Sequence, residues 1–272
     1  MPATVPTELL RVTARSRSSR ADELAAEEPL EIRVEGRSIA VVMRTPGHDR
    51  ELAAGFLLTE GIVKCAKDIF DITSCLAEGG AGKGNAVDVA LTRPGGFDFE
   101  KLTRHVFTSS SCGICSKATI GAVLKRRRPL RDGMRVTTKV ILSLPRQLAR
   151  HQEAFRRTGG LHACALFDGD GRFVAAREDV GRHNALDKLA GFALLGKLTP
   201  LRGHIALLSG RASFEMMQKS HAAGIAVVVA ISAPSSLAVE FARESRQTLV
   251  GFLRGGAMNV YAGAERIAAR KA

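Results

Sequence analysis

The pattern of apolar and polar positions divides the chain into three parts. Residues 1–28 mix Arg, Ser, Ala and Glu without a clear period, which predicts a flexible tail or a loosely docked arm. Residues 29–143 carry shorter patterns. These predict a hairpin that turns at Glu35–Arg37, a helix over residues 49–62 with Asp49 as N-cap, and a half-buried strand over residues 86–92. We therefore expect a small N-terminal α+β domain.

Residues 144–272 alternate between helical and strand patterns, and nearly every strand is apolar throughout. Helices are expected over residues 144–155, 182–195, 213–223 and 235–245, and strands over residues 161–167, 172–178, 204–209, 225–232 and 248–254. Apolar strands joined by helices indicate a sheet that is covered on both faces. We predict an α/β fold whose ligand lies at the carboxyl ends of the strands, beside helix N-termini.

Composition narrows the class of protein. The chain has 272 residues, of which 45% are hydrophobic, so it is globular and long enough for two modest domains. No apolar run is long enough to span a bilayer, and the N-terminus lacks the apolar core of a secretion signal. The five cysteines, an odd number, fit a reducing compartment better than a disulfide framework. We expect a cytoplasmic protein with free thiols and no membrane partner.

The charge is strongly basic. A formal net charge of +13 and a pI near 10.1 imply an anionic partner. With one Tyr and no Trp there are few aromatic surfaces for stacking bases, so nucleic acid ranks below a phosphorylated ligand. Basic residues concentrate between Lys125 and Arg150. A solvated basic face is the more ordinary interpretation of that stretch, and a landing surface for an anionic protein or cofactor is the alternative.

Cys112 and Cys115 form the clearest candidate for chemistry. A zinc site that combined them with His162 and Cys164 would have no recognised spacing, and Cys164 fits a small buried hydrophobe better. A thioredoxin-like site would require the pair to open an early strand–helix unit, whereas about a hundred residues precede it here. The pair stands before a helical pattern with Lys117 nearby. Helix dipole and positive charge therefore favour a thiolate at Cys112.

Five stretches, in the same order along the chain, are similar to the motifs of the FdhD family. They are ELAAGFLLTEGI (Glu51–Ile62), SSCGICSKA (Ser110–Ala118), EDVGRHNALDKL (Glu178–Leu189), SGRASFEMMQKS (Ser209–Ser220) and TLVGFLRGGAMNVY (Thr248–Tyr261). The resemblance covers nearly the whole chain after its first 28 residues. Five motifs in the family's order are far more specific than a CxxC pair alone.

This resemblance implies a function in sulfur delivery, since the family consists of formate dehydrogenase accessory sulfurtransferases. A cysteine desulfurase would place sulfur on Cys112 as a persulfide, with Cys115 assisting. The chain would then deliver the sulfur to the bis-molybdopterin guanine dinucleotide cofactor of molybdenum, for the catalytic subunit of a formate dehydrogenase. The resemblance also implies a homodimer.

The resemblance further implies that residues 144–272 form a cytidine-deaminase-like three-layer sandwich. At the matching helix starts, Asn184 and Ala185 follow His183, and Ser209–Phe214 contains no cysteine, so we expect no zinc. Arg and Ser at helix N-termini instead suit the pyrophosphates and guanine nucleotide of the cofactor. The expected cofactor-binding residues are Arg182, His183, Arg211 and Ser213, with the family's cofactor segment Phe252, Leu253, Arg254, Gly255, Gly256 and Ala257.

Some alternatives stay open at this point. Arg182 and Arg211 could each form a structural ion pair with Asp179 or Glu215 instead of binding a ligand. The protein could be a non-catalytic chaperone that holds the cofactor, with only a structural role for the CxxC pair. A zinc-dependent deaminase is a third interpretation, and the missing ligands argue against it.

Overall fold

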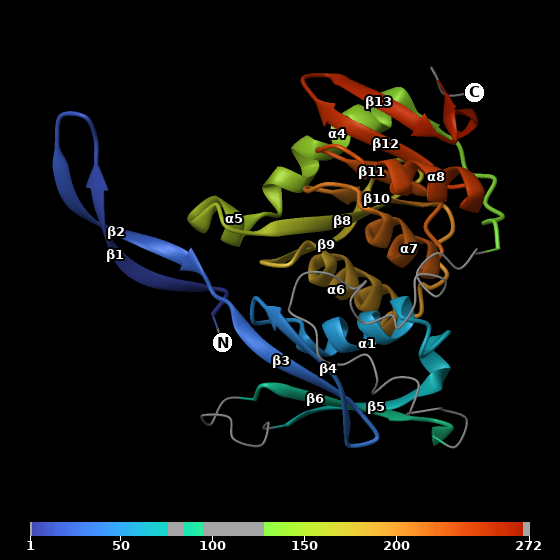
Figure 1. Ribbon diagram of the computed structural model, residues 1–272. Helices are drawn as coiled ribbons and strands as arrows, with labels where there is room; N and C mark the ends of the chain where they lie inside the picture. Colours follow the sequence, from blue (N-terminus) through green and yellow to red (C-terminus); the bar gives the residue numbers. More distant parts are fainter. Residues whose placement is uncertain (1, 76–83, 95–127, 269–272) are drawn as a thin grey trace.

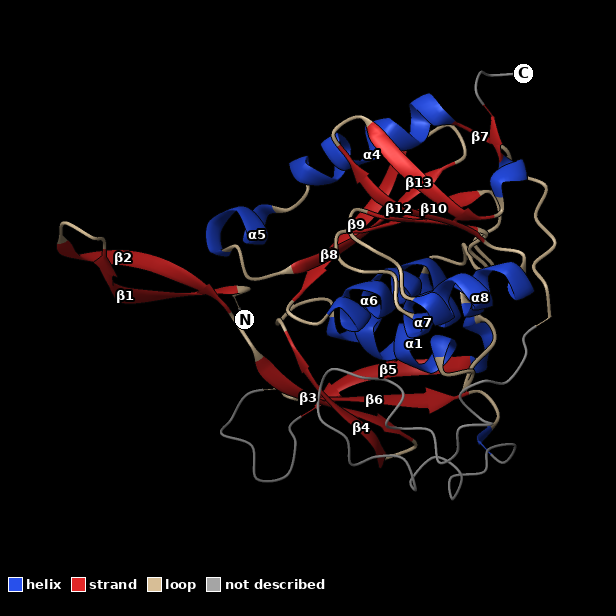
Figure 2. Cartoon of the chain, turned by 45° about the horizontal axis from the view of Figure 1, so that its top comes forward, coloured by secondary structure: helices blue, strands red, loops and turns tan. Residues whose placement is uncertain are grey.

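The two larger β-sheets of the described residues have a layer of helices between them. The computed structural model describes residues 2–75, 84–94 and 128–268. A six-stranded sheet has the order β13-β12-β11-β10-β8-β9, and a four-stranded sheet has the order β4-β3-β6-β5. Helices α1, α6, α7 and α8 lie between the two sheets, and α4 covers the outer face of the larger one (Figures 1 and 2).

The six-stranded sheet and its helices come from the second half of the chain. Its strands are β8 (His162–Asp168), β9 (Phe173–Asp179), β10 (His204–Leu208), β11 (Val227–Ala230), β12 (Thr248–Arg254) and β13 (Ala257–Ala262). Its helices are α4 (Thr138–Arg150), α5 (Glu153–Thr158), α6 (Arg182–Leu195), α7 (Phe214–Ala222) and α8 (Ser236–Ser245). Strands β10, β11 and β12 are parallel, whereas β8, β9 and β13 each run antiparallel to the strand they join.

Both faces of this sheet are buried, as the apolar strands predict. Successive residues of a strand point to opposite faces, so Ile205 and Leu207 of β10 pack toward α4 while Ala206 and Leu208 face α6 and α7. On the α4 side, Ile141, Leu144 and Leu148 recur at helical spacing and are all fully buried. The expectation of a sheet covered on both faces is confirmed.

The four-stranded sheet comes from the first half of the chain. It contains β3 (Glu28–Val34), β4 (Arg37–Arg44), β5 (Ile69–Cys75) and β6 (Ala86–Leu91), and η1 (Ala66–Asp68) leads into β5. The predicted β3–β4 hairpin is present. Its turn residues Glu35 and Gly36 both have positive φ, as a two-residue hairpin turn requires. Helix α1 (Asp49–Thr59) covers one face of this sheet through Leu52 and Leu57.

Helices α1 and α6 approach so closely that only glycine fits at their crossing. A Cβ atom on Gly55 would lie 1.7 Å from the carbonyl oxygen of Asp187, and one on Gly191 would lie 1.8 Å from that of Glu51. Apolar residues of both helices and both sheets belong to one continuous core. The two halves of the chain are therefore packed together as tightly as a single protein interior.

A buried group of polar side chains, which we call the interhelical cluster, lies beside this crossing. It consists of Thr59 and Glu60 at the end of α1, Asp187 of α6 and Lys219 of α7. Lys219 Nζ donates to both oxygens of Asp187 at 3.0 and 2.9 Å, to Thr59 Oγ1 at 2.9 Å and to Glu60 Oε1 at 3.2 Å. Thr59 Oγ1 donates to Asp187 Oδ1 at 2.7 Å. Every member has a partner within the cluster.

The first 28 residues, for which a flexible tail or a loosely docked arm was expected, contain two strands. β1 (Thr4–Val12) and β2 (Arg17–Ala25) form an antiparallel ribbon that projects from the body (Figures 1 and 2). Arg157 of α5 pairs with Glu23 at its base. The ribbon meets solvent on both faces, with Leu10 and Val12 more than half exposed, so its sequence has no apolar-in, polar-out alternation to reveal the strands.

Smaller differences concern boundaries. His48, with φ of 58°, is the residue before α1, and Asp49 is the first helical residue instead of the expected N-cap. The expected domain boundary between residues 143 and 144 falls inside α4. A short parallel pair, β7 (Val136–Thr137) with β14 (Ile267–Ala268), joins the start of α4 to the segment after η3 (Ala264–Arg266). Within the described ranges, no helix is long and apolar enough to cross a membrane.

The basic stretch between residues 125 and 150 begins outside the described residues. The basic residues that are described lie before α4 and along its solvent face, and all are exposed: Arg128, Arg131, Arg135, Lys139, Arg146 and Arg150. Helix α4 buries its opposite face against the sheet. A solvated basic face accounts for these charges without a ligand.

Candidate functional site

Topology brings several chain segments to one edge of the six-stranded sheet. The carboxyl ends of the parallel strands β10, β11 and β12 share this edge. Because β8 is antiparallel to β10, its first residue, His162, lies there too, and His162 pairs in register with Asp179 at the end of β9. Helices α6, α7 and α8 begin just after β9, β10 and β11. Open α/β sheets bind ligands at such an edge.

Asp179 fixes the start of α6. Its carboxylate accepts hydrogen bonds from the backbone N–H of Gly181 at 2.8 Å and from Asn184 Nδ2 at 3.0 Å, and it pairs with Lys188 Nζ at 2.7 Å. Asn184 Nδ2 also donates to the carbonyl of Met43 in β4, at 2.7 Å. A Cβ atom on Gly181 would lie 2.9 Å from Asn184 Nδ2, so a side chain there would push the Asn184 amide away from these hydrogen bonds. The start of α6 is thereby held against both sheets.

His183 and Glu215 connect the starts of α6 and α7. His183 Nε2 lies 2.7 Å from Glu215 Oε2, and the two side chains are only 11% and 7% exposed. Asp179 pairs with Lys188, so the carboxylate at the end of β9 already has its cation. Asp179 and Glu215 are the carboxylates with which Arg182 or Arg211 could have formed structural ion pairs. In the structure Asp179 contacts Lys188, and Glu215 contacts His183.

Three polar atoms at these helix starts are buried without a hydrogen-bond partner among the described residues: Arg182 Nε, His183 Nε2 and Ser213 Oγ. Of these, His183 Nε2 has the close contact with the Glu215 carboxylate, whereas Arg182 Nε and Ser213 Oγ have no such contact. Ser213 is the N-cap residue of α7, but its side chain makes no capping hydrogen bond. The neighbouring Ser209 hydroxyl, by contrast, accepts from the backbone N–H of Ala163 at 2.8 Å. Buried polar atoms normally have partners, so Arg182 and Ser213 are candidates for binding a ligand or water.

His162 lies among the basic residues of this edge. Burial lowers the pKa of His162 below its usual range, and Arg182, His183 and Arg211 act in the same direction, while Asp179 opposes them. A Cβ atom on Gly210 would lie 3.2 Å from His162 Nδ1, so the imidazole is close to the loop that carries Arg211. We call His162, Arg182, His183, Arg211 and Ser213 the edge cluster. Its excess of positive charge suits an anion.

The expected cofactor segment forms the end of β12 and the turn into β13. Phe252 has φ of 52°, which is rare for an aromatic residue, and its N–H donates to the carbonyl of Ser232 at 3.1 Å. Gly255 and Gly256 also have positive φ and make the turn. Leu253 is buried in the core beneath α4, so its side chain serves packing. Arg254 is exposed, and its guanidinium lies 5.5 Å from the centroid of the Phe252 ring.

The cysteines expected to carry the chemistry, Cys112 and Cys115, lie outside the described residues. Cys164 is fully buried in β8, where burial raises its pKa, so it is the small hydrophobe that was expected. Cys65 is free and exposed, and Cys75 is free and partly exposed. Among the described residues, no three His, Cys, Asp or Glu side chains gather as ligands for a metal.

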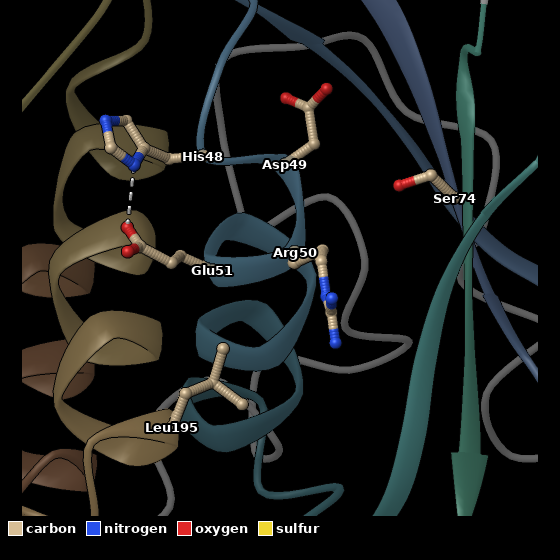
Figure 3. A pocket seen from close by; sticks show the side chains of 6 residues that line it. All are labelled: His48, Asp49, Arg50, Glu51, Ser74 and Leu195. Atoms are coloured by element: carbon tan, nitrogen blue, oxygen red, sulfur yellow. Dashed lines mark ion pairs between the residues drawn. The ribbon is translucent and has the colours of Figure 1, made fainter.

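A separate open hollow lies at the start of α1 (Figure 3). His48, Asp49, Arg50 and Glu51 line it, with Ser74 of β5 and Leu195 at the end of α6. Its carboxylates are already paired: Glu51 with Arg177 at 2.5 Å and with His48 at 3.3 Å, and Asp49 with Arg44 at 2.9 Å. Against the effect of burial, the bonds from Arg177 and His48 lower the pKa of Glu51 to about 2. Both carboxylates of this hollow are thus paired, and none of the expected site residues lines it.

Sequence reasoning placed Arg182, His183, Arg211 and Ser213 together at one edge, and the structure brings their segments together there. It did not assign His162 or Glu215 to this site. His162 was considered only as a zinc ligand, and Glu215 only as a partner for an arginine. The sequence places His162 near the start of an expected buried strand over residues 161–167, but the direction of that strand, which brings His162 to this edge, is known only from the sheet pairing.

Comparison with known proteins gives consistent matches. The family model described as the FdhD/NarQ family matches residues 25–268. The sulfur carrier protein FdhD of Streptomyces coelicolor is 51% identical over 270 residues, which cover 97% of this chain and 95% of that protein. The sulfur carrier protein FdhD of Mycobacterium tuberculosis is 50% identical over 92% of this chain and 93% of its own. A solved structure described as a candidate formate dehydrogenase accessory protein from Desulfotalea psychrophila is similar, with a TM-score of 0.78, 26% identity, and coverage of 98% and 100%.

Proposed function

The chain belongs to the FdhD/NarQ family, and from that membership we propose that it is a sulfur carrier in the maturation of a formate dehydrogenase. The observation that carries this proposal is the near full-length identity of about half to proteins described as sulfur carriers. The partners are a cysteine desulfurase as donor and the catalytic subunit of the dehydrogenase as recipient. The cargo is delivered to the molybdenum cofactor that the dehydrogenase uses.

Cys112 is the sulfur acceptor in this proposal. Its thiolate attacks the terminal sulfur of the persulfide on the desulfurase. A new S–S bond forms at Cys112, and the old S–S bond breaks with its electron pair leaving on the desulfurase thiolate. The transfer needs no outside oxidant or reductant. Among the described cysteines, Cys164 is excluded as acceptor because it is buried and its pKa is raised.

Cys115 has two roles open to it, and they differ chemically. It can assist Cys112 while the persulfide is handed on. It can instead attack Cys112 Sγ, which forms a Cys112–Cys115 disulfide and expels the outer sulfur as hydrosulfide. In that second route the two thiols supply the electrons that reduce the sulfur, and a thiol reductant must later restore the pair. We favour the assisting role.

The edge cluster is the proposed binding site for the guanine nucleotide arms of bis-molybdopterin guanine dinucleotide. Arg182 and Arg211 would bind phosphate oxygens with the N-termini of α6 and α7, and the Ser213 hydroxyl is available to the same ligand. Phe252, Arg254 and the Gly255–Gly256 turn would contact the cofactor farther along the same sheet edge. We also propose that residues 144–272 keep a cytidine-deaminase-like arrangement without zinc, and that the chain acts as a homodimer.

Mass spectrometry of the intact protein tests the sulfur-carrier proposal. Wild type, Cys112→Ala and Cys115→Ala are incubated with a cysteine desulfurase and cysteine. We expect one added sulfur on wild type and on Cys115→Ala, and none on Cys112→Ala. Cys65→Ala is the matched control, because it removes an exposed thiol at another position and should retain the added sulfur.

Other outcomes have distinct meanings. An adduct on Cys112→Ala but not on Cys115→Ala would move the acceptor to Cys115. If wild type gains no sulfur while the dehydrogenase is still activated in its presence, the protein is a chaperone that holds the cofactor, and the sulfur-carrier proposal is wrong.

A further inference from the structure

His162 is the one imidazole of the edge cluster to which neither the family motifs nor the proposed function gives a role. It is partly buried at the first position of β8, and its side chain approaches the loop of Gly210 and Arg211. The charged groups around it come from every neighbouring element. Arg182 and His183 belong to α6, Arg211 follows β10, and Asp179 ends β9. Asp179 is paired with Lys188, and His183 with Glu215.

The balance of these groups is positive, because Arg182 and Arg211 bring two charges to this edge while Asp179 and Glu215 are already in contact with Lys188 and His183. If His162 is neutral in the ligand-free protein, it adds no further positive charge to the two arginines of this edge. A bound polyphosphate would reverse that balance by adding at least two negative charges beside the same ring. Opposite charge close to an imidazole favours its protonated form.

We propose that His162 is a proton-linked ligand-binding residue of the edge cluster, neutral when the edge is empty and protonated when a diphosphate group is bound. The inference rests on the proposed nucleotide site and deepens it by assigning an additional contact and a coupled proton. One proton is taken up from solvent as the ligand binds, while Asp179 and Glu215 keep their contacts with Lys188 and His183. The ligand class is a nucleoside diphosphate or inorganic pyrophosphate.

The free and bound states then differ in a definite way with pH. In the free protein the pKa of His162 is lowered by burial and by Arg182, His183 and Arg211, so the ring is neutral at pH 7. The bound ligand raises this pKa, so binding should strengthen as the pH falls from above the bound-state pKa toward the free-state pKa. The ligand's own last phosphate proton also titrates near pH 6, and this effect must be separated from that of His162.

The test compares dissociation constants of wild type and His162→Gln for guanosine diphosphate and for inorganic pyrophosphate, by calorimetry between about pH 6 and 8.5. The ratio of the variant's Kd to that of wild type cancels the titration of the ligand. We expect this ratio to be near one at the upper pH and about ten at the lower pH, as one unit of pKa shift would give. His204→Gln is the matched control, because His204 begins β10 at the opposite edge of the sheet, and its ratio should stay near one.

A second measurement needs no variant. The binding enthalpy of wild type, measured at one pH in two buffers of different ionisation enthalpy, should report net proton uptake. A ratio that is flat with pH, or binding by wild type without proton uptake, would overturn the role of His162 and leave the nucleotide site standing. If wild type binds neither probe at any pH, the site itself is wrong. The persulfide experiment stays independent of that result.

Discussion

The interhelical cluster and the edge cluster both involve α6 and α7, the first within these helices and the second at their starts, but they are built in opposite ways. In the interhelical cluster, Lys219 contacts Asp187, Glu60 and Thr59, and positive charge is matched by carboxylates. At the edge cluster, Arg182, Arg211 and two histidines gather where both neighbouring carboxylates are already paired. One turn or so of helix separates the two arrangements on α6 and on α7.

This contrast separates a structural polar group from a candidate binding group. Burial alone would lower the pKa of Lys219, but the carboxylates of Asp187 and Glu60 raise it above its usual value. For His162, burial and the neighbouring Arg182, His183 and Arg211 lower the pKa, and Asp179 opposes them without reversing the shift. A cluster complete in itself supports the fold, whereas one with unpartnered atoms, such as Ser213 Oγ, is completed from outside.

Gly55→Ala would break the comparison most strongly, because it disrupts the interhelical cluster without changing any of its charges. The added methyl group would lie 1.7 Å from a backbone oxygen of α6, so α1 and α6 must separate. We expect a loss of about 4 kcal/mol or more in the free energy of unfolding, measured by urea denaturation.

The control for this prediction is Gly133→Ala, where nothing lies within 4 Å of the added atom. Gly133→Ala should change stability by no more than about 0.5 kcal/mol. A Gly55→Ala protein as stable as wild type would mean that the helix crossing is looser than described, and that the interhelical cluster does not depend on it.

Lys219→Met tests whether the interhelical cluster is held by its charges. The substitution leaves Asp187 buried and without its cation, so we expect a loss of about 3 kcal/mol in stability. The double variant Lys219→Met, Asp187→Leu should recover much of that loss, because neither charge then remains buried. Lys139→Met, on the exposed face of α4, is the matched control and should be nearly neutral. Equal losses in the single and double variants would show that the pair contributes nothing specific to stability.

Much of the larger sheet could be predicted from the sequence because its strands are buried on both faces. Runs such as the one at Val227–Ala230 have few other ways to satisfy their apolar side chains, and the helices between them carry a clear period. The ribbon formed by β1 and β2 could not be predicted in this way. Its side chains face solvent on both sides, so strand pairing leaves no trace in the pattern of polarity.

The candidate site was predictable in its location but not in all of its members. Arg182, Arg211 and Ser213 lie between the end of a strand and the first residue of the next helix, or at that residue, which is a pattern along the chain. The contact between His183 and Glu215 and the position of His162 depend on β8 running antiparallel to β10. That direction is a property of the whole sheet, and no local stretch of sequence encodes it. The close approach of Gly55 to α6 is likewise invisible until both helices are placed.

Arg211→Ala is the mildest change to the fold and sharpens the comparison from the side of the edge cluster. Arg211 is exposed, so its removal should leave the free energy of unfolding within about 0.5 kcal/mol of wild type. It does remove a charge-assisted contact to a phosphate, so binding of guanosine diphosphate should weaken by about 1.5–3 kcal/mol, which is about 10- to 150-fold in Kd.

Arg202→Ala is the matched control, since Arg202 is also an exposed arginine but precedes β10 at the opposite edge of the sheet. Calorimetry that finds the same affinity for Arg211→Ala as for Arg202→Ala would remove Arg211 from the site. If Arg211→Ala lowers the free energy of unfolding as well as the affinity, Arg211 has a structural role, as the residues of the interhelical cluster do. The contrast between a structural and a ligand-binding cluster would then not hold for Arg211.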